Sequence, residues 1–179
     1  NRITKITDKR GAITKYTYDK LGRLTKITNP MGGEKNLSYD KIGNISSIED
    51  ERGNTTSYSY NKIGKLIEEK DPYGRKTTYN YDKNGNLIKI IDPMGYSMSY
   101  IYNKNNKITK VTDKEGNITN YTYDEAGNIT SVTDPLGRIT KLEYDNLNRI
   151  SKITDKDGKN ISYTYDKEDN ITKVTDKMG

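Results

Sequence analysis

Apolar and polar residues follow one pattern along this chain, and the pattern repeats every 21 residues without insertion or deletion. One copy begins at Tyr16-Thr17-Tyr18-Asp19 and continues through Gly22 and Leu24. A fixed period near 20 residues is typical of stacked repeats, in which each unit buries its apolar face only against its neighbours. The second tyrosine of the pattern recurs at Tyr18, Tyr39, Tyr60, Tyr81, Tyr102, Tyr123, Tyr144 and Tyr165.

Each repeat divides into two short strands and two turns. In one copy, residues 23–28 and 33–39 are rich in β-branched and aromatic residues, which favour strands. Residues 29–32 and 40–43 separate them and contain the residues typical of turns. Strands joined by such short turns must be antiparallel neighbours, so the pattern predicts a series of β-hairpins.

Both predicted turns have the form Asp/Asn-x-x-Gly. A type I turn favours a short polar acceptor at its first position, and glycine at its fourth position can adopt a positive φ. The turn that sometimes contains proline has its glycine in every copy, at Gly11, Gly32, Gly53, Gly74, Gly95, Gly116, Gly137, Gly158 and Gly179. The turn after the second tyrosine has Gly22, Gly43, Gly64, Gly85 and Gly127, or else Asn106, Asn148 and Asp169. Asn and Asp are the non-glycine residues that best tolerate the left-handed region.

Apolar residues two positions apart lie on the same face of a strand, so they are expected to form two rows along the predicted sheet. These pairs are Tyr16/Tyr18, Leu37/Tyr39, Tyr58/Tyr60, Tyr79/Tyr81, Tyr100/Tyr102, Tyr121/Tyr123, Leu142/Tyr144 and Tyr163/Tyr165.

The intervening strands carry two aliphatic series. The first is Leu24, Ile45, Leu66, Leu87, Ile108, Ile129, Ile150 and Ile171, and the second is Ile27, Ile48, Ile90, Val111, Val132, Ile153 and Val174. The two series are three residues apart, so regular alternation would place them on opposite faces. Either a β-bulge intervenes or both faces are partly buried. Glu69 occupies the second aliphatic position in its copy, and we expect that repeat to pack least well.

The predicted fold class is all-β: tandem 21-residue antiparallel β-hairpin repeats forming a continuous meander strip. A bulge beside the turn glycine would add one residue per hairpin and increase the twist. About sixteen twisted strands do not remain a flat sheet, so we expect the strip to curl into a spiral or shell. Residues 1–179 would form a single array of about eight and a half repeats. Both ends lie within the repeat phase, which indicates a fragment of a longer protein.

Composition narrows the function classes. The chain has a mean hydropathy of -1.04 and only 30% hydrophobic residues, as in many disordered proteins, but 14 of its 16 tyrosines recur in register and favour an ordered structure. It contains no cysteine and no histidine, which removes thiolate metal sites and the commonest general base and metal ligand. We therefore expect no enzymatic activity, no cofactor and no metal.

The net charge of +6 raises the possibility of an anionic partner. The lysines are interleaved with acidic residues in every repeat, which is typical of a solvated polar face. No apolar run approaches the length needed to cross a bilayer. We expect no nucleic-acid binding and no membrane insertion. The turn Asp residues are accounted for by turn chemistry and lack the Asp-x-Asp-x-Asp-Gly spacing of a calcium loop.

The segment Tyr18-Asp19-Lys20-Leu21-Gly22-Arg23-Leu24, continued to Pro30-Met31-Gly32, resembles the YD repeat of the Rhs family. The resemblance covers essentially the whole chain. It implies a β-strip wound into a large hollow shell, as in bacterial Rhs and wall-associated polymorphic toxins, toxin-complex subunits and teneurins. In bacterial members the shell encloses a C-terminal toxin domain, which implies a secreted or cell-surface location.

The chain departs from the full family pattern in two respects. It contains no distinct C-terminal effector. None of its Asp-Pro-x-Gly copies is followed by the leucine of the family's junction between core and toxin, as Asp134-Pro135-Leu136-Gly137-Arg138 shows. The autoproteolysis known in the family is therefore not expected here.

Two functional hypotheses follow. The first is a structural segment, either the wall of a shell or an extended surface fibre, whose partners are further repeats of the parent chain and an enclosed toxin. The second is a carbohydrate or cell-wall binding module that uses exposed Tyr and Asp residues in repeated weak sites. Exposed strand edges could also allow end-to-end self-association. The residues expected to define the repeat are Tyr18, Asp19, Gly22, Tyr39, Asp40, Gly43, Tyr60, Tyr81, Asp82, Gly85, Tyr102, Tyr123, Asp124, Gly127, Tyr144, Asp145, Tyr165 and Asp166.

Overall fold

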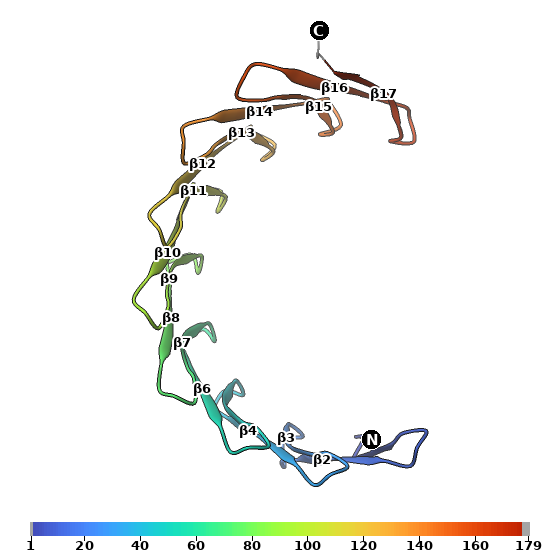
Figure 1. Cartoon of the computed structure of the whole chain (residues 1–179), viewed down its shortest axis with the longest axis vertical. Coiled ribbons are helices and arrows are strands. Elements are labelled where there is room, and N and C mark those ends of the chain that lie inside the picture. Colours follow the sequence, from blue (N-terminus) through green and yellow to red (C-terminus); the bar gives the residue numbers. More distant parts are fainter. Residues whose placement is uncertain (1, 177–179) are drawn as a thin grey trace. The chain divides into compact units, whose positions relative to one another are not determined.

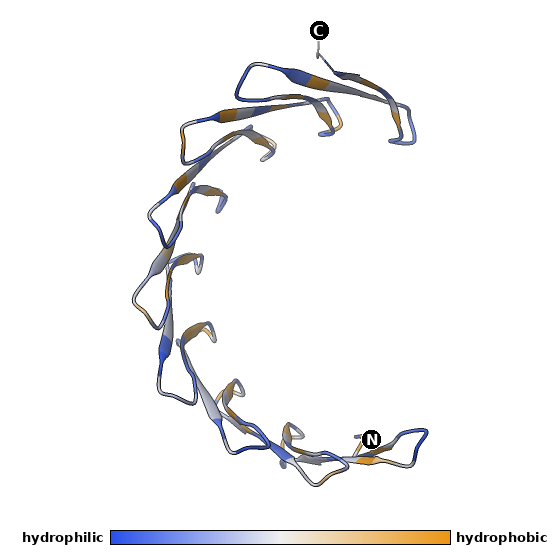
Figure 2. Ribbon diagram, in the orientation of Figure 1, coloured by the Kyte–Doolittle hydropathy of each residue, from blue (hydrophilic) through white to orange (hydrophobic). Residues whose placement is uncertain are grey.

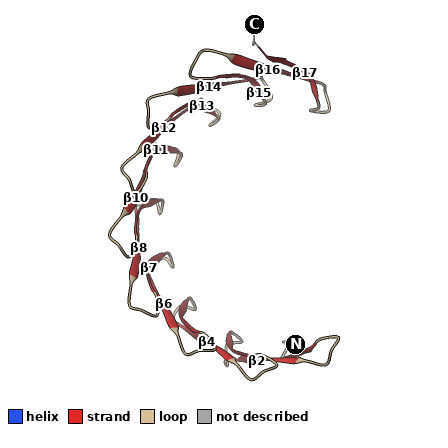
Figure 3. Ribbon diagram, in the orientation of Figure 1, coloured by secondary structure: helices blue, strands red, loops and turns tan. Residues whose placement is uncertain are grey.

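The computed structural model describes residues 2–176, and the regular secondary structure of these residues consists entirely of strands (Figure 3). The strands divide between two compact units. The first comprises Asn1–Asn80 and Ile91–Gly95, and the second comprises Tyr81–Ile90 and Tyr96–Gly179. The described residues contain no helix long and apolar enough to cross a membrane.

Strands of six and five residues alternate through most of each unit. The first unit contains β1 (Lys5–Thr7), β2 (Ile13–Tyr18), β3 (Leu24–Thr28), β4 (Glu34–Tyr39), β5 (Ile45–Glu49), β6 (Thr55–Tyr60), β7 (Leu66–Lys70) and most of β8 (Lys76–Tyr81). The second contains most of β9 (Leu87–Ile91), β10 (Ser97–Tyr102), β11 (Ile108–Thr112), β12 (Ile118–Tyr123), β13 (Ile129–Thr133), β14 (Ile139–Tyr144), β15 (Ile150–Thr154), β16 (Asn160–Tyr165) and β17 (Ile171–Asp176).

Consecutive strands are antiparallel neighbours within each unit, which confirms the predicted meander of hairpins (Figure 1). The same order holds from β10 to β17. The predicted strand boundaries were close to the observed ones: β3 begins at Leu24 rather than at residue 23, and β4 begins at Glu34 rather than at residue 33.

A bulge inside the strand places the two aliphatic series on the same face of the sheet, although they are three residues apart. Between β2 and β3, Tyr16 is opposite Ile27 and Tyr18 is opposite Leu24, with a register shift between these pairs. Thr25 is therefore an extra residue, and Leu24 and Ile27 lie on the same face as the two tyrosines. The same shift occurs in the hairpins β4–β5, β6–β7, β10–β11, β12–β13, β14–β15 and β16–β17.

The turns have the predicted chemistry. In the turn after Tyr18, the Gly22 N–H donates to the Asp19 carbonyl oxygen at 2.9 Å, and Gly22 has a φ of 81°. The turn from Asn29 to Gly32 has the same arrangement, at 3.0 Å with a φ of 87°. Asn106, Asn148 and Asp169 replace glycine with φ values of 57°, 61° and 65°. The last predicted turn glycine, Gly179, lies outside the described residues.

The bulge predicted beside the turn glycine is present: the Gly22 N–H donates to the Asp19 carbonyl oxygen and the Asp19 N–H donates to the Arg23 carbonyl oxygen, so Asp19 faces two residues. The register shift inside the strand is a second bulge, which the sequence analysis did not predict. Both kinds of turn contain the same positive-φ glycine. Among the described strand pairings, the register shift occurs in hairpins closed by the turn after the second tyrosine, such as β2–β3, and not in those closed by the other turn, such as β3–β4. The extra residue lies inside the following strand, at the position of Thr25. The positive φ of the turn glycine therefore does not explain why one kind of hairpin has a bulge inside its strand and the other does not.

The sheet has no second layer within either unit. Among the described residues, no side chain is fully buried. In β12, Tyr121 and Tyr123 are half-buried and alternate with exposed Asn120 and Thr122, as the strand period requires. Figure 2 shows the hydrophobic bands recurring from strand to strand. The opposite face carries cross-strand ion pairs such as Lys26 with Glu34, at 2.8 Å.

Candidate functional site

The turns after the second tyrosine gather the motif residues at one edge of each unit, which we call the tyrosine edge. In the first unit it consists of the turns 19–22, 40–43 and 61–64, and in the second of the turns 82–85, 103–106, 124–127, 145–148 and 166–169. The other turns form the proline edge, named after the prolines found in some of them.

The acid that opens each turn of the tyrosine edge is fully used by the turn itself. The Asp19 Oδ1 atom accepts hydrogen bonds from the N–H groups of Leu21 and Arg23, each at 2.9 Å. Its Oδ2 atom accepts from Arg23 Nε at 2.7 Å. The backbone N–H of Arg23 is the largest cause that holds the Asp19 pKa below its usual range, assisted by the guanidinium group.

In the tyrosine edge, the type of residue four positions after the turn-opening residue depends on whether that first residue is Asp or Asn: Asp is followed by Arg or Asn, and Asn is followed by Lys. Asp40 is followed by Asn44, whose Nδ2 donates to the Asp40 Oδ2 atom at 3.0 Å. Where the first position is Asn61, which has no second oxygen, the matching residue is Lys65, and the turn keeps the two backbone bonds. The full set is Asp19/Arg23, Asp40/Asn44, Asn61/Lys65, Asp82/Asn86, Asn103/Lys107, Asp124/Asn128, Asp145/Arg149 and Asp166/Asn170. Our sequence analysis missed this correlation, although the sequence displays it.

The second tyrosine of the pattern links one repeat to the previous one in both units. The Tyr39 hydroxyl on β4 donates to the Leu24 carbonyl oxygen on β3 at 2.7 Å. The β3–β4 ladder runs only from Thr28 to Lys26, so Leu24 lies just beyond its end. The hydroxyl therefore satisfies a carbonyl group that no ladder partner reaches. The same bond joins Tyr18 to Ile3, Tyr102 to Leu87, Tyr123 to Ile108, Tyr144 to Ile129 and Tyr165 to Ile150.

Arginine adds a second link between repeats. The Arg23 guanidinium group, held by Asp19, lies 4.5 Å from the centroid of the Tyr39 ring. Arg149 is placed in the same way, 4.4 Å from the centre of the Tyr165 ring. A guanidinium group over an aromatic face is attracted by the ring's quadrupole.

The three residues that replace glycine in these turns accept hydrogen bonds from the previous repeat. Asn86 Nδ2 donates to the Asn106 Oδ1 atom at 2.7 Å. Asn128 donates in the same way to Asn148 at 2.8 Å. Arg149 Nη1 donates to the Asp169 Oδ1 atom at 2.6 Å. These residues therefore do more than tolerate a positive φ, which is all that the sequence analysis had assigned to them.

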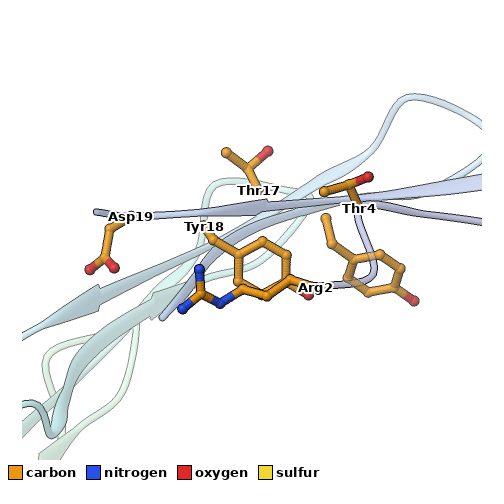
Figure 4. Close-up of a pocket in the computed structure, with 6 residues that line it drawn as sticks. Arg2, Thr4, Thr17, Tyr18 and Asp19 are labelled. Atoms are coloured by element: carbon orange, nitrogen blue, oxygen red, sulfur yellow. The ribbon is translucent and has the colours of Figure 1, made fainter. Parts of the chain in front are cut away.

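An open pocket of about 790 Å³ lies beside the first tyrosine pair, lined by Arg2, Thr4, Tyr16, Thr17, Tyr18 and Asp19. Figure 4 shows Arg2 alongside Tyr18, with Thr17 projecting from the opposite side of the strand. A similar pocket in the second unit includes Tyr121, Thr122, Tyr123 and Asp124. The Tyr18 hydroxyl and the Asp19 carboxylate already have partners within the chain. The motif tyrosine and acid of the first pocket are therefore not available to position a reacting substrate.

No group of three acidic, histidine or cysteine side chains that could hold a metal ion occurs among residues 2–176. Within one repeat, the motif Asp and turn glycine share a turn, and the second tyrosine contacts the strand of the previous repeat. Their contacts are the turn bonds and inter-repeat bonds described above.

Comparison with known proteins gives one family. The model described as RHS Repeat matches residues 1–34, 39–76, 60–96, 81–118, 102–139, 123–159 and 144–177. None of the curated proteins matches the chain.

The chain aligns with segments of solved structures of toxin complexes. A Tc holotoxin pore of Photorhabdus luminescens has 19% sequence identity and a TM-score of 0.49, with 92% of this chain and 9% of that chain covered. A TcdB2-TccC3 complex has 19% identity and a TM-score of 0.48, with the same shares covered. The chain thus spans only 9% of the length of these structures.

Proposed function

Because the chain belongs to the RHS repeat family, we propose that it is a structural wall segment of a larger secreted or cell-surface protein, with no catalytic activity of its own. In this proposal, residues 1–179 form one array, and the strip curls with the other repeats of the parent protein into a shell around a toxin domain. The motif Tyr, Asp and Gly residues serve the wall as turn and inter-repeat contacts.

The main support for this proposal is that the motif side chains are hydrogen-bonded within the fold itself. An active site needs polar groups that the fold does not consume. In the tyrosine edge, the side-chain oxygen of the Asp or Asn that opens a turn accepts from backbone N–H groups of that turn, as Asp145 does from Leu147 and Arg149. The tyrosine hydroxyl of the same repeat is bonded to the backbone of its neighbour, as Tyr144 is to Ile129. The most regular polar groups of the chain are therefore structural.

The bulges support curling of the strip. A bulge bends its strand and increases the local twist. The hairpins of the tyrosine edge have an additional bulge inside the strand that those of the proline edge lack, so the distortion accumulates in one sense from repeat to repeat. A sheet with no second layer is free to follow this bias.

Limited proteolysis of the parent protein would test the shell. We expect the domain that adjoins the array to resist cleavage while the array is folded, and to be cut once mild denaturant opens the array. Cleavage of that domain in the folded parent at the rate of the free domain would contradict enclosure. Hydrolase activity of the present chain that disappeared in Asp124→Asn would contradict a purely structural role.

Carbohydrate or cell-wall binding is the second candidate function. The recurrence of the same open pocket beside Tyr18 and beside Tyr123 favours it, because repeated weak sites can act together. A glycan array is the direct test. Binding that strengthens as repeats are added would support this function, and the absence of binding to any glycan or wall preparation would exclude it.

A further inference from the structure

Three consecutive turns of the tyrosine edge in the first unit each present a lysine followed by a large aliphatic residue. The exposed fractions of the aliphatic residues are 76% for Leu21, 68% for Ile42 and 71% for Ile63. The preceding lysines, Lys20, Lys41 and Lys62, are exposed as well. These are the tips of neighbouring hairpins, so the six residues form one row, which we call the lysine-aliphatic row.

The fold does not require aliphatic side chains at these tips. Within the turn, Leu21 contributes its backbone N–H, which donates to the Asp19 Oδ1 atom. In the second unit, the equivalent positions are Asn84, Asn105, Ala126, Leu147 and Glu168, and the turns with Asn84 and Asn105 have the same backbone bonds. Exposed Leu147 is preceded by Asn146 and not by a lysine, so it does not repeat the combination. The exposed Leu and Ile side chains of the first unit are therefore unexplained by turn chemistry.

The row is positively charged. Its three turns and the residues that follow them contain five cations and two carboxylates: Lys20, Arg23, Lys41, Lys62 and Lys65, with Asp19 and Asp40. The two carboxylates accept hydrogen bonds from within their own turns, from Arg23 and Asn44. An anionic surface that approached this edge would meet the lysines at its tips.

The spacing of the tips favours a broad, soft surface. Equivalent positions in successive hairpins are about 9.6 Å apart, because two strand separations lie between them. The aliphatic side chains therefore project separately, each at the end of its own turn. A folded protein would need a matching depression for each tip, whereas the boundary between lipid headgroups and acyl chains accepts an aliphatic side chain at any position.

We propose that the lysine-aliphatic row docks on an anionic lipid bilayer, with Leu21, Ile42 and Ile63 entering the headgroup boundary and the lysines contacting anionic headgroups. This docking places the edge on the membrane and requires no spanning segment. The proline edge lacks this combination of a lysine and an exposed aliphatic residue in consecutive turns. Its exposed Met31 and Tyr73 each follow a proline, and the turn between them has Glu51 and Arg52 instead.

Vesicle co-sedimentation of the whole chain tests the proposal. We expect binding to vesicles of phosphatidylcholine and phosphatidylserine, and little binding to phosphatidylcholine alone. The triple variant Leu21→Asn, Ile42→Asn and Ile63→Asn should bind at least about tenfold more weakly, since three aliphatic contacts are lost. The triple variant Lys20→Gln, Lys41→Gln and Lys62→Gln should also weaken binding, by roughly fivefold for each lysine.

The Asn variants keep the fold, because the chain itself uses Asn at this turn position. Circular dichroism verifies this before binding is measured. The matched control, Met31→Asn with Tyr73→Asn on the proline edge, should bind like the parent chain. Absence of binding to the anionic vesicles would overturn the proposal. Unchanged binding by the triple Asn variant would also overturn it, because non-specific attraction of the net charge would then account for the result.

Discussion

The hydroxyl group of the second tyrosine has a role that its ring alone could not perform. Tyr123 donates to the Ile108 carbonyl oxygen at 2.6 Å, where the β11–β12 ladder has ended. The first tyrosine of the pair packs on the same face, and Leu replaces it at Leu37 and Leu142. The sequence shows that the second position is always Tyr and that the chain has no Phe. It could not show which carbonyl the hydroxyl reaches, because that depends on where the ladder stops.

We expect Tyr123→Phe to lower the free energy of unfolding by about 1 kcal/mol, because a carbonyl group loses its hydrogen-bond partner. Tyr121→Phe in the same strand is the matched control. The Tyr121 hydroxyl donates no hydrogen bond to any other described residue, so its removal should have a much smaller effect. Urea denaturation followed by circular dichroism measures both. Equal losses in the two variants would show that ring packing, and not the hydroxyl, distinguishes the positions.

The turn carboxylates make stability depend on pH. The backbone N–H of Asn128, followed by its side-chain amide, lowers the pKa of Asp124. The side-chain amide of Asn170 is the largest cause that lowers the pKa of Asp166. A folded-state pKa below the unfolded one contributes stability that is complete above the unfolded value and is lost as pH falls through the folded one.

The chain is therefore expected to keep its stability from neutral pH down to about 5 and to lose it progressively below about 4. Urea midpoints measured across this range provide the test. A variant with Asp124→Asn and Asp166→Asn has fewer such carboxylates, so its midpoint should fall less steeply with acid. An identical slope in the variant would mean that other groups control the acid response.

At the scale of the element, the sequence could predict those features of the strands and turns that depend on local residue types. The 21-residue period and the Asp-x-x-Gly turns predicted the hairpins, their order and the tyrosine face, which the structure confirms. The bulge inside the strand could not be predicted, because its extra residue has no characteristic residue type. In the structure the bulged Thr25 donates its hydroxyl to the Thr17 carbonyl oxygen at 3.2 Å. The equivalent positions include Ser46, Ile67 and Ile88, which cannot all form this bond.

Glu69 interrupts the second aliphatic series in β7. It lies opposite Tyr58 in the same register as its apolar equivalents, so the strand pairing is retained. Burial is the main cause that raises the pKa of the Tyr58 hydroxyl, and the charge of Glu69 raises it further. An ionised carboxylate beside a half-buried ring is a poor substitute for an aliphatic side chain.

We expect Glu69→Val to raise the free energy of unfolding by roughly 0.5 to 1 kcal/mol, because it restores an aromatic and β-branched cross-strand pair. The pKa of Tyr58 should fall toward its usual value. Glu68→Val is the control, because Glu68 lies on the other face and pairs with Lys76 at 3.0 Å. The Glu68→Val variant has the same increase in β-strand propensity but makes no contact with Tyr58. Stabilisation by both variants alike would assign the gain to strand preference alone.

At the scale of the whole molecule, the contacts follow the sequence. Within each unit, the strands in contact are consecutive ones, and no fully buried core joins distant repeats among the described residues. The links between repeats include the ladder, the tyrosine hydroxyl, the side-chain bonds of the tyrosine edge and the bond from Asn29 to Glu51 on the proline edge. Stability in such an array is close to a sum of repeat terms and nearest-neighbour terms.

This organisation predicts that damage stays local. Tyr39→Phe removes the bond to Leu24 in the first unit, and Tyr144→Phe removes the bond to Ile129 in the second. We expect amide hydrogen exchange to accelerate around β3 and β4 in the one variant and around β13 and β14 in the other. The losses should add to within about 0.5 kcal/mol in the double variant, because the two sites share no partner. Accelerated exchange in the unmutated unit, or a clear departure from additivity, would show that the repeats are coupled beyond their nearest neighbours.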